Sequence, residues 1–152
     1  MTIIERLEHA KRTGNYAGMF EAVPYAAFLG LTAHVEDGAL ITTMKYADHL
    51  IGNPALPALH GGTTGALLES AAIFEVLYRL ETIVLPKTIT ITIDYLRSAA
   101  AVDTHARAVI TRQGRRVANV RVEAWQADRA QPVAMAHVIA LVKSESPTAS
   151  AG

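Results

Sequence analysis

The sequence runs Leu59-His60-Gly61-Gly62-Thr63-Thr64-Gly65-Ala66-Leu67-Leu68-Glu69-Ser70-Ala71-Ala72 where a loop enters its most apolar helical pattern. Two glycines at the entrance leave their backbone N–H groups uncovered. The first turn of a helix has N–H donors without an internal partner and a partial positive charge. The segment therefore predicts a docking point for an anion or for a polarised carbonyl oxygen.

Glu69 is the unusual residue of this segment because it is a carboxylate within an apolar pattern. At helical spacing it shares a stripe with five small or apolar residues, Gly65, Ala66, Ala72, Ile73 and Val76. Glu75 and Arg79 instead predict an ordinary i, i+4 ion pair on another face of the helix. Glu69 is thus the candidate for a carboxylate with a chemical role.

Gly61 and Glu69 are eight residues apart, which is about 12 Å along a helix axis. A catalytic acid or base must lie within roughly 3 Å, or one water molecule, of its target. One chain therefore cannot bring both groups to the same carbon atom. Two copies can, if their helices cross antiparallel near Gly65 and Ala66, and the sequence predicts a site shared by two protomers.

Composition restricts the class of protein. The 152 residues, 51% of them hydrophobic, predict one folded domain over residues 1–143 and a flexible tail over 144–152. The 14 basic and 14 acidic residues cancel, so no field for binding nucleic acid is expected. The absence of cysteine excludes disulfides and thiol catalysis and fits a cytoplasmic protein. We expect no signal peptide and no membrane span, since prolines and glycines interrupt the longest uncharged run, 49–68.

The N-terminal part predicts helices. Thr2 and Glu5 match a capping box, and the apolar spacing that follows predicts a helix that ends near Gly14. A second, short helical piece is expected over residues 16–22, with Pro24 as its stop.

A hairpin and a long helix are expected next. Two apolar runs, 28–35 and 39–46, flank Asp37-Gly38, and such a dipeptide between apolar runs is a strong hairpin signal. Residues 47–59, with two prolines, predict a loop. The apolar helix should then run from Gly62 to about Leu80.

The C-terminal half predicts four strands. Residues 88–95 alternate strictly between apolar and polar, as a strand with one buried face does. Residues 103–111 and 117–125 alternate likewise and predict a hairpin. Residues 133–142 are more continuously apolar, which predicts a strand buried on both faces. One long apolar helix followed by antiparallel strands indicates an α+β domain with the sheet curled around the helix.

This element order and its motifs resemble the hotdog fold and, more narrowly, the phenylacetate-pathway (PaaI-like) acyl-CoA thioesterase family. The resemblance covers residues 30–142 and rests on Leu59-His60-Gly61-Gly62, Glu69 nine residues after His60, Asp94-Tyr95-Leu96-Arg97, and Arg112-Gln113-Gly114-Arg115-Arg116. It implies a single hotdog domain, with a curved antiparallel sheet around one central helix and an N-terminal helical segment. It also implies a homodimer, or a homotetramer built as a dimer of dimers.

The resemblance implies hydrolysis of an acyl-CoA thioester without metal or cofactor. The Gly61 amide would polarise the thioester carbonyl, and Glu69 of the other protomer would activate water or attack the carbonyl itself. His60 would orient the loop. This family usually has Asn or Gln six residues before its HGG motif; Pro54 stands there, so Asn53 is our candidate for that role.

Arginines are the candidates for holding the phosphates of CoA, because guanidinium groups suit phosphate oxygens. Three of them surround the predicted turn and one follows the strand of residues 88–95: Arg112, Arg115, Arg116 and Arg97. The alternative is that these arginines are only the exposed charges of an ordinary solvated hairpin turn, without a binding role.

Two other functions remain open at this point. A hotdog hydratase or dehydratase acting on acyl thioesters would pair the helix acid with a proton-transferring histidine, either His60 or His49. A non-catalytic protein that binds acyl-CoA is disfavoured by the carboxylate in the apolar stripe, since burying an uncompensated charge is costly. The histidines lack the spacing of metal ligands, and no G-x-S-x-G motif indicates a serine nucleophile.

Overall fold

The computed structural model describes residues 1–80 and 84–142, so the predicted tail, 144–152, lies outside the described residues. Its main sheet has six strands, all paired antiparallel, in the order β1-β2-β6-β7-β8-β5. The strands are β1 (Leu31–Glu36), β2 (Ala39–Met44), β5 (Lys87–Tyr95), β6 (Thr104–Gln113), β7 (Val117–Trp125) and β8 (Ala134–Leu141).

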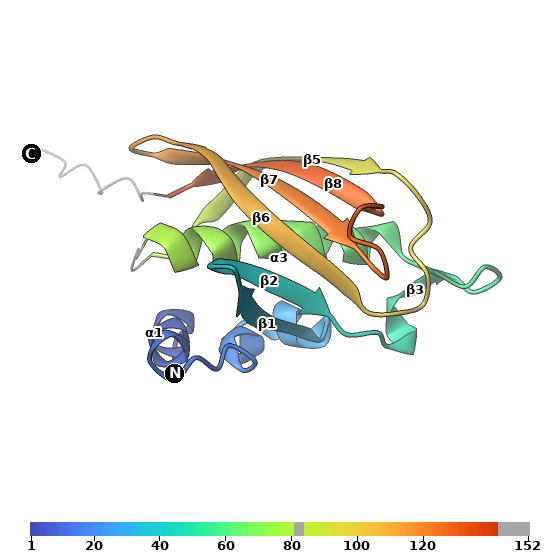
Figure 1. The fold of residues 1–152 in the computed structure, drawn as a ribbon, viewed down its shortest axis with the longest axis horizontal. Helices are drawn as coiled ribbons and strands as arrows, with labels where there is room; N and C mark the ends of the chain where they lie inside the picture. The colour runs from blue at the N-terminus through green and yellow to red at the C-terminus, as the bar shows by residue number, and fades with distance from the viewer. Residues whose placement is uncertain (81–83, 143–152) are drawn as a thin grey trace, which may run out of the picture.

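The central helix α3 (Gly61–Leu80) lies along the inner face of this curved sheet, as Figure 1 shows. The inner face of β7 is made of four residues with no solvent exposure, Ala118, Val120, Val122 and Ala124. Small side chains there let the helix approach closely, and α3 contacts β2, β5, β6, β7 and β8. The α+β architecture with a sheet wrapped around one long helix is confirmed, and it is the hotdog arrangement.

The strands alternate as the sequence predicts, with one exception. The inner residues of β6, including Ala106 and Ala108, are buried. The strand β8, however, is not buried on both faces, because buried residues alternate with partly or fully exposed ones, among them His137. The prediction for residues 133–142 was wrong in this respect, because the outer positions, Met135, His137, Ile139 and Leu141, are not fully covered.

The N-terminal helices cover one side of α3. The helix α1 (Ile3–Thr13) has the predicted Thr2–Glu5 capping box and ends at Gly14. A 3₁₀ turn η1 (Met19–Ala22) follows, and its Phe20 meets Phe74 of α3 edge-to-face with 4.2 Å between ring centroids. This contact joins the N-terminal segment to the core.

Pro24 begins a helix instead of ending one. It is the first residue of α2 (Pro24–Phe28), a position where the missing proline N–H leaves no hydrogen bond unmade. Phe28 therefore ends this helix, and the prediction that the first strand begins at Phe28 was wrong. The Asp37-Gly38 hairpin is confirmed, with positive φ angles of 50° and 72° at the two turn residues.

The segment 47–59 is more ordered than a loop. It contains a 3₁₀ turn η2 (Asp48–Leu50) and a small hairpin of β3 (Ile51–Asn53) and β4 (Ala58–Leu59). These strands are too short to give an alternating pattern, so the sequence offers no periodic signal for them.

The strand β5 forms one end of the sheet. Its inner side chains, Ile91 and Ile93, are only half-buried, while Ile89 and Tyr95 are each 56% exposed. The sheet therefore ends in a nine-residue strand with apolar side chains left open. No helix within the described residues is long and apolar enough to span a membrane.

Candidate active site

The start of α3 is fixed by His60. Its carbonyl oxygen accepts hydrogen bonds from the N–H and the hydroxyl of Thr63, at 3.0 and 2.7 Å. Its ring Nδ1 accepts the N–H of Gly62 at 2.8 Å. A Cβ at position 62 would come 2.8 Å from that nitrogen, so the ring can lie this close only over glycine. His60 thus shapes the helix start.

The amide of Gly61 differs from that of Gly62, because no hydrogen-bond partner for it is found within residues 1–80 and 84–142. Gly61 is exposed and is the first residue of α3, so its N–H stands at the positive end of the helix. One of the two glycine donors is therefore used internally and the other is available to a ligand.

Tyr95 holds the same turn of the helix from the strand β5. Its hydroxyl donates a hydrogen bond of 2.8 Å to the carbonyl oxygen of Gly61. Gly65, one turn further on, is buried beneath Ile93 and Tyr95. The small size of Gly65 thus serves packing against β5 of its own chain, and Ala66 remains partly exposed.

A pocket of about 340 Å³ opens beside Gly61. It is lined by residues of β4, of α3, of the end of β5 and the chain that follows it, and by the residue before β8: Ala58, Leu59, Gly61, Thr64, Tyr95, Leu96, Arg97, Ser98, Ala99 and Val133. Of the predicted site residues, the pocket brings together Gly61 and Arg97. Arg97 is anchored there by hydrogen bonds to the carbonyl oxygen of Pro132, at 3.1 Å, and to Gln131, at 2.9 Å.

The sequence predicts Glu69 within the apolar stripe of α3 and Glu75 on another face, but the structure buries Glu75 and leaves Glu69 exposed. Glu69 is exposed on the single chain, whereas Glu75 is buried with 2% exposure. Glu75 does pair with Arg79, at 2.7 Å, and this hydrogen bond raises the pKa of Arg79. The helix is apolar over most of its surface, so its sequence does not reveal which side meets the sheet.

Asn53 and three of the arginines lie apart from this pocket. The side-chain oxygen of Asn53 accepts the N–H of Ala55 at 3.0 Å, so it forms a local turn at the exposed hairpin. Arg112 lies near the end of β6, and Arg115 and Arg116 lie in the β6–β7 turn, which is near the C-terminal end of α3 (Figure 1). Within one chain they therefore do not meet Gly61.

Tyr95 is the site residue that the sequence did not single out. It belongs to the Asp94-Tyr95-Leu96-Arg97 motif, but a tyrosine that ends an alternating strand carries no signal for a contact with a helix 34 residues earlier. No group of three metal-binding side chains is found among the described residues.

Comparison with protein families matches residues 52–141 to the acyl-CoA thioesterase N-terminal domain. The chain is similar to the solved structure of a Chromobacterium violaceum protein, with 31% identity, a TM-score of 0.74, and coverage of 93% of this chain and 99% of that one. It is also similar to a phenylacetic acid degradation-related protein from Ralstonia eutropha, with 27% identity, a TM-score of 0.71, and coverage of 84% and 100%.

A third similar structure is that of a Bacillus halodurans protein solved with CoA. Its identity is 22% and its TM-score 0.73, with coverage of 95% of this chain and 93% of that one, which is a likeness of fold. None of the curated proteins matches the sequence.

Proposed function

Because this chain belongs to the acyl-CoA thioesterase family and is a hydrolase of thioesters, we propose that it cleaves acyl-CoA at the pocket beside Gly61, with Glu69 of a second protomer as the reacting carboxylate. The observation that carries the proposal is the unpartnered Gly61 amide at the start of α3, next to a pocket.

The Gly61 N–H is the proposed donor to the thioester oxygen. Negative charge develops on that oxygen when the carbonyl carbon is attacked, and a donor already aimed at it stabilises this charge; loss of one such donor typically lowers kcat by roughly 10²–10³. Tyr95 supports the assignment because its hydroxyl donates a hydrogen bond to the carbonyl oxygen of Gly61 and so holds the start of the helix in place.

Glu69 is proposed to act from the partner. Within one helix it lies about 12 Å beyond Gly61, too far for both to touch one carbon atom. Its exposure on the single chain leaves the carboxylate free to enter a site on a second chain. The attack then follows one of two routes, which differ in the atom that bonds to carbon.

In the first route Glu69 takes a proton from water while the water oxygen bonds to the carbonyl carbon. The C–S bond breaks, its electron pair leaves with sulfur, and the proton passes to the CoA thiolate. In the second route a Glu69 oxygen bonds to the carbon and CoA leaves, and water then attacks the Glu69 carbonyl carbon of the resulting anhydride, which releases the acid. A single turnover in ¹⁸O-water separates the routes, because the label enters the released acid in the first route and the Glu69 carboxylate in the second.

The strand β5 is the proposed dimer contact. A long end strand with exposed apolar side chains invites pairing with another strand, and Ile89, Tyr95 and Leu96 are exposed there. Two β5 strands related by a two-fold axis would pair antiparallel, and the same axis would set their α3 helices antiparallel. This is the arrangement that Gly61 and Glu69 require. A further pairing of dimers into tetramers stays a prediction.

CoA is the proposed leaving group, and Arg97 is the proposed contact for its phosphates, since it lines the pocket. Arg112, Arg115 and Arg116 could serve only from another chain. Asn53 is retained as a candidate for holding water, although its oxygen already accepts the Ala55 N–H and its amide N–H groups would have to act. The cytoplasm remains the proposed compartment, since the chain has no cysteine.

The hydratase alternative needs a histidine free to transfer protons. The Nδ1 of His60 accepts the Gly62 N–H, and the Nε2 of His49 lies 2.9 Å from the Phe28 carbonyl oxygen on the surface. Both rings already have structural hydrogen bonds, and this favours the thioesterase.

The decisive assay measures free thiol released from a panel of aliphatic and aromatic acyl-CoAs. We expect release by the wild type, and a loss of at least about 10²-fold in Glu69→Gln, because no other carboxylate replaces the base. Glu8→Gln, an exposed acid on α1, is the matched control and should stay fully active. A folded Glu69→Gln enzyme of unchanged rate would refute the role of Glu69, and light scattering that shows a monomer would refute the shared site.

A further inference from the structure

The strands β2 and β6 separate part-way along the sheet. Their pairing ends at Ile41 and Arg107, although β6 continues to Gln113. The next amide of β2, that of Leu40, donates instead to the Glu75 carboxylate at 3.2 Å. A side chain from α3 thus takes the place of the strand partner, and a pocket of about 500 Å³ opens between the strands. We call this pocket the β2–β6 notch.

The carboxylate in the notch is fully engaged. One oxygen of Glu75 accepts the Leu40 N–H, and the other accepts the Nε–H of Arg79 at 2.7 Å. Arg79 also donates to the carbonyl oxygen of Gly38 at 2.7 Å. Glu75 is therefore the counter-ion of Arg79, and it is not available to neutralise a second cation.

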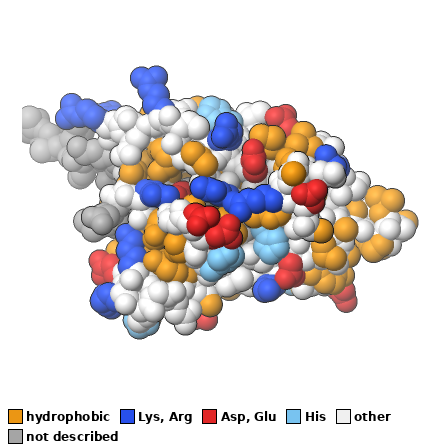
Figure 2. Space-filling model, in the orientation of Figure 1, with side chains coloured by type: hydrophobic (Ala, Val, Ile, Leu, Met, Phe, Trp, Pro, Cys, Tyr) orange, Lys and Arg blue, Asp and Glu red, His pale blue; other side chains and the backbone are white. Residues whose placement is uncertain are grey.

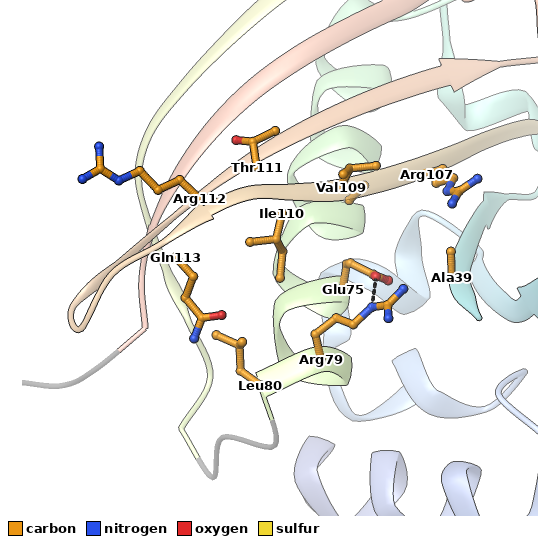
Figure 3. Close-up of a pocket in the computed structure, with 11 residues that line it drawn as sticks. Ala39, Glu75, Arg79, Leu80, Arg107, Val109, Ile110, Thr111, Arg112 and Gln113 are labelled. Carbon is orange, nitrogen blue, oxygen red and sulfur yellow. Dashed lines mark hydrogen bonds and ion pairs between the residues drawn. The ribbon is translucent and has the colours of Figure 1, made fainter. Parts of the chain in front are cut away.

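Arg107 is that second cation. It approaches the notch from β6, opposite Arg79 on α3, whereas Arg112 extends along the strand away from both (Figure 3). Arg107 is half-buried, and its buried Nε has no hydrogen-bond partner among the described residues. A buried donor without an acceptor is unfavourable, and more so when it carries charge. The geometry calls for an oxyanion at this position.

The charged side chains that line the notch are mostly basic, which favours binding of an oxyanion. Arg107 also borders a smaller hollow of about 290 Å³ on the outer face of the sheet, together with Arg121, Glu123 and Arg129. Figure 2 shows basic side chains in a row across this face. Glu36 pairs with Arg129 at 2.8 Å and Glu123 lines the same hollow, so the excess of positive charge around Arg107 is small.

Beyond the Glu75–Arg79 pair the notch has an apolar part, whereas Thr111, Arg112 and Gln113 line its end nearest the β6–β7 turn. Leu80 and Ile110 line the apolar part, on the side away from Arg107 (Figure 3). A ligand that fills the notch therefore needs an anionic head at Arg107 and an apolar body toward Ile110. Inorganic phosphate would leave the apolar part empty.

We propose that the β2–β6 notch binds an organic carboxylate with an apolar body, the chemical class that thioester hydrolysis releases. Glu75 follows Gly61 by 14 residues, about 21 Å along the helix, so the notch is separate from the pocket at Gly61 of the same chain. The ligand class rests on the hydrolase assignment, but the site does not depend on the roles of Gly61 and Glu69.

The test is titration of the full chain with octanoate, followed by methyl NMR. Binding in the notch shifts the methyl signals of Ile110 and Leu80, whereas binding at the thioester pocket shifts those of Leu59 and Leu96. We expect Arg107→Gln to weaken the affinity for octanoate, obtained from the Ile110 shift, by about tenfold or more, since a charge-assisted hydrogen bond is lost. Arg107→Lys keeps the positive charge but loses the planar guanidinium group, so its affinity for octanoate should lie between those of the wild type and Arg107→Gln. Arg12→Gln, an exposed arginine on α1, should bind as the wild type does.

Three results would overturn the proposal: no shift of Ile110 or Leu80, a shift that Arg107→Gln leaves unchanged, or Arg107-dependent binding of inorganic phosphate or CoA without binding of octanoate. None of these readouts uses catalysis. Thiol release by Arg107→Gln should equal that of the wild type in the absence of added acid, so a failure of the thioesterase mechanism would be seen separately.

Discussion

The hydroxyl of Tyr95 donates a hydrogen bond of 2.8 Å to the carbonyl oxygen of Gly61. This contact joins the end strand of the sheet to the first residue of the central helix. It fixes the peptide unit beside the proposed oxyanion donor, and Tyr95 acts in the account as a positioning residue.

Tyr95→Phe tests this role. The ring still packs on Gly61, but the hydroxyl is lost, so the Gly61–Gly62 peptide, which adjoins the donating Gly61 N–H, gains freedom to rotate. We expect kcat to fall about 2- to 10-fold with little change in KM, because a neutral hydrogen bond is worth about 1 kcal/mol. Tyr25→Phe removes an exposed hydroxyl on α2 and should leave both constants unchanged. A change in KM alone would indicate that Tyr95 only contacts substrate.

The Gly61 amide itself can be removed by Gly61→Pro. Proline is tolerated at the first position of a helix and has no N–H. We expect kcat to fall roughly 10²–10³-fold. Gly61→Ala is the matched control: it keeps the N–H and adds a Cβ 3.3 Å from the exposed Tyr95 ring, which can move slightly. Equal losses in the two variants would mean that bulk, and not the donor, matters.

Glu75 is predicted to support stability and not catalysis. Glu75→Ala leaves the Leu40 N–H without its acceptor and Arg79 without its partner. Since Arg79 is half-exposed and stays hydrated, we expect a loss of about 1–3 kcal/mol in the free energy of unfolding, measured by urea denaturation. Glu75→Gln keeps an acceptor of the same shape and should lose less. If the alanine variant were as stable as the wild type, the buried pair would have no structural role.

Asp103 gives stability a pH dependence. The Tyr46 N–H at 2.8 Å and the Lys45 ammonium at 3.0 Å lower the pKa of Asp103 below its ordinary value of 3.8. The ionised form is thus favoured by folding, and its stabilisation is present above pH 3.8 and disappears as pH falls through the lowered pKa.

Asp103→Asn should therefore lower the free energy of unfolding by about 0.5–1 kcal/mol at pH 7, a modest value because the side chain is partly exposed. The difference from the wild type should shrink on acidification below pH 3.8. A difference that stays constant over this range would contradict the assignment. Glu8→Gln, in which an exposed carboxylate is lost, is the control.

Periodic elements were the predictable part of the fold. The alternation in β6 and β7 and the long apolar run of α3 predicted their bounds closely, because one buried face imposes a regular pattern on the sequence. Pro24 was misassigned because proline suits the first turn of a helix as well as the residue after one. The β3–β4 hairpin has too few residues to show any period.

The candidate site was predictable only where it is local in sequence. Gly61 and His60 belong to one helix start, and their neighbours imply their geometry. The burial of Glu75 depends on how far β6 diverges from β2, and the Tyr95 contact joins residues 34 positions apart, so neither follows from spacing. A helix that is apolar on most of its surface does not reveal which acid faces the sheet.

The central claim is that one protomer supplies Gly61 and the other supplies Glu69, and mixing two inactive variants tests it most directly. Glu69→Gln and Gly61→Pro are each purified, mixed at equal concentration, and allowed to exchange subunits. A mixed dimer then holds one site with both groups intact and one with neither. Half of the dimers are mixed, so thiol release should recover to about a quarter of the wild-type rate per chain. A mixture that exchanges subunits and remains as inactive as its components would contradict the shared site.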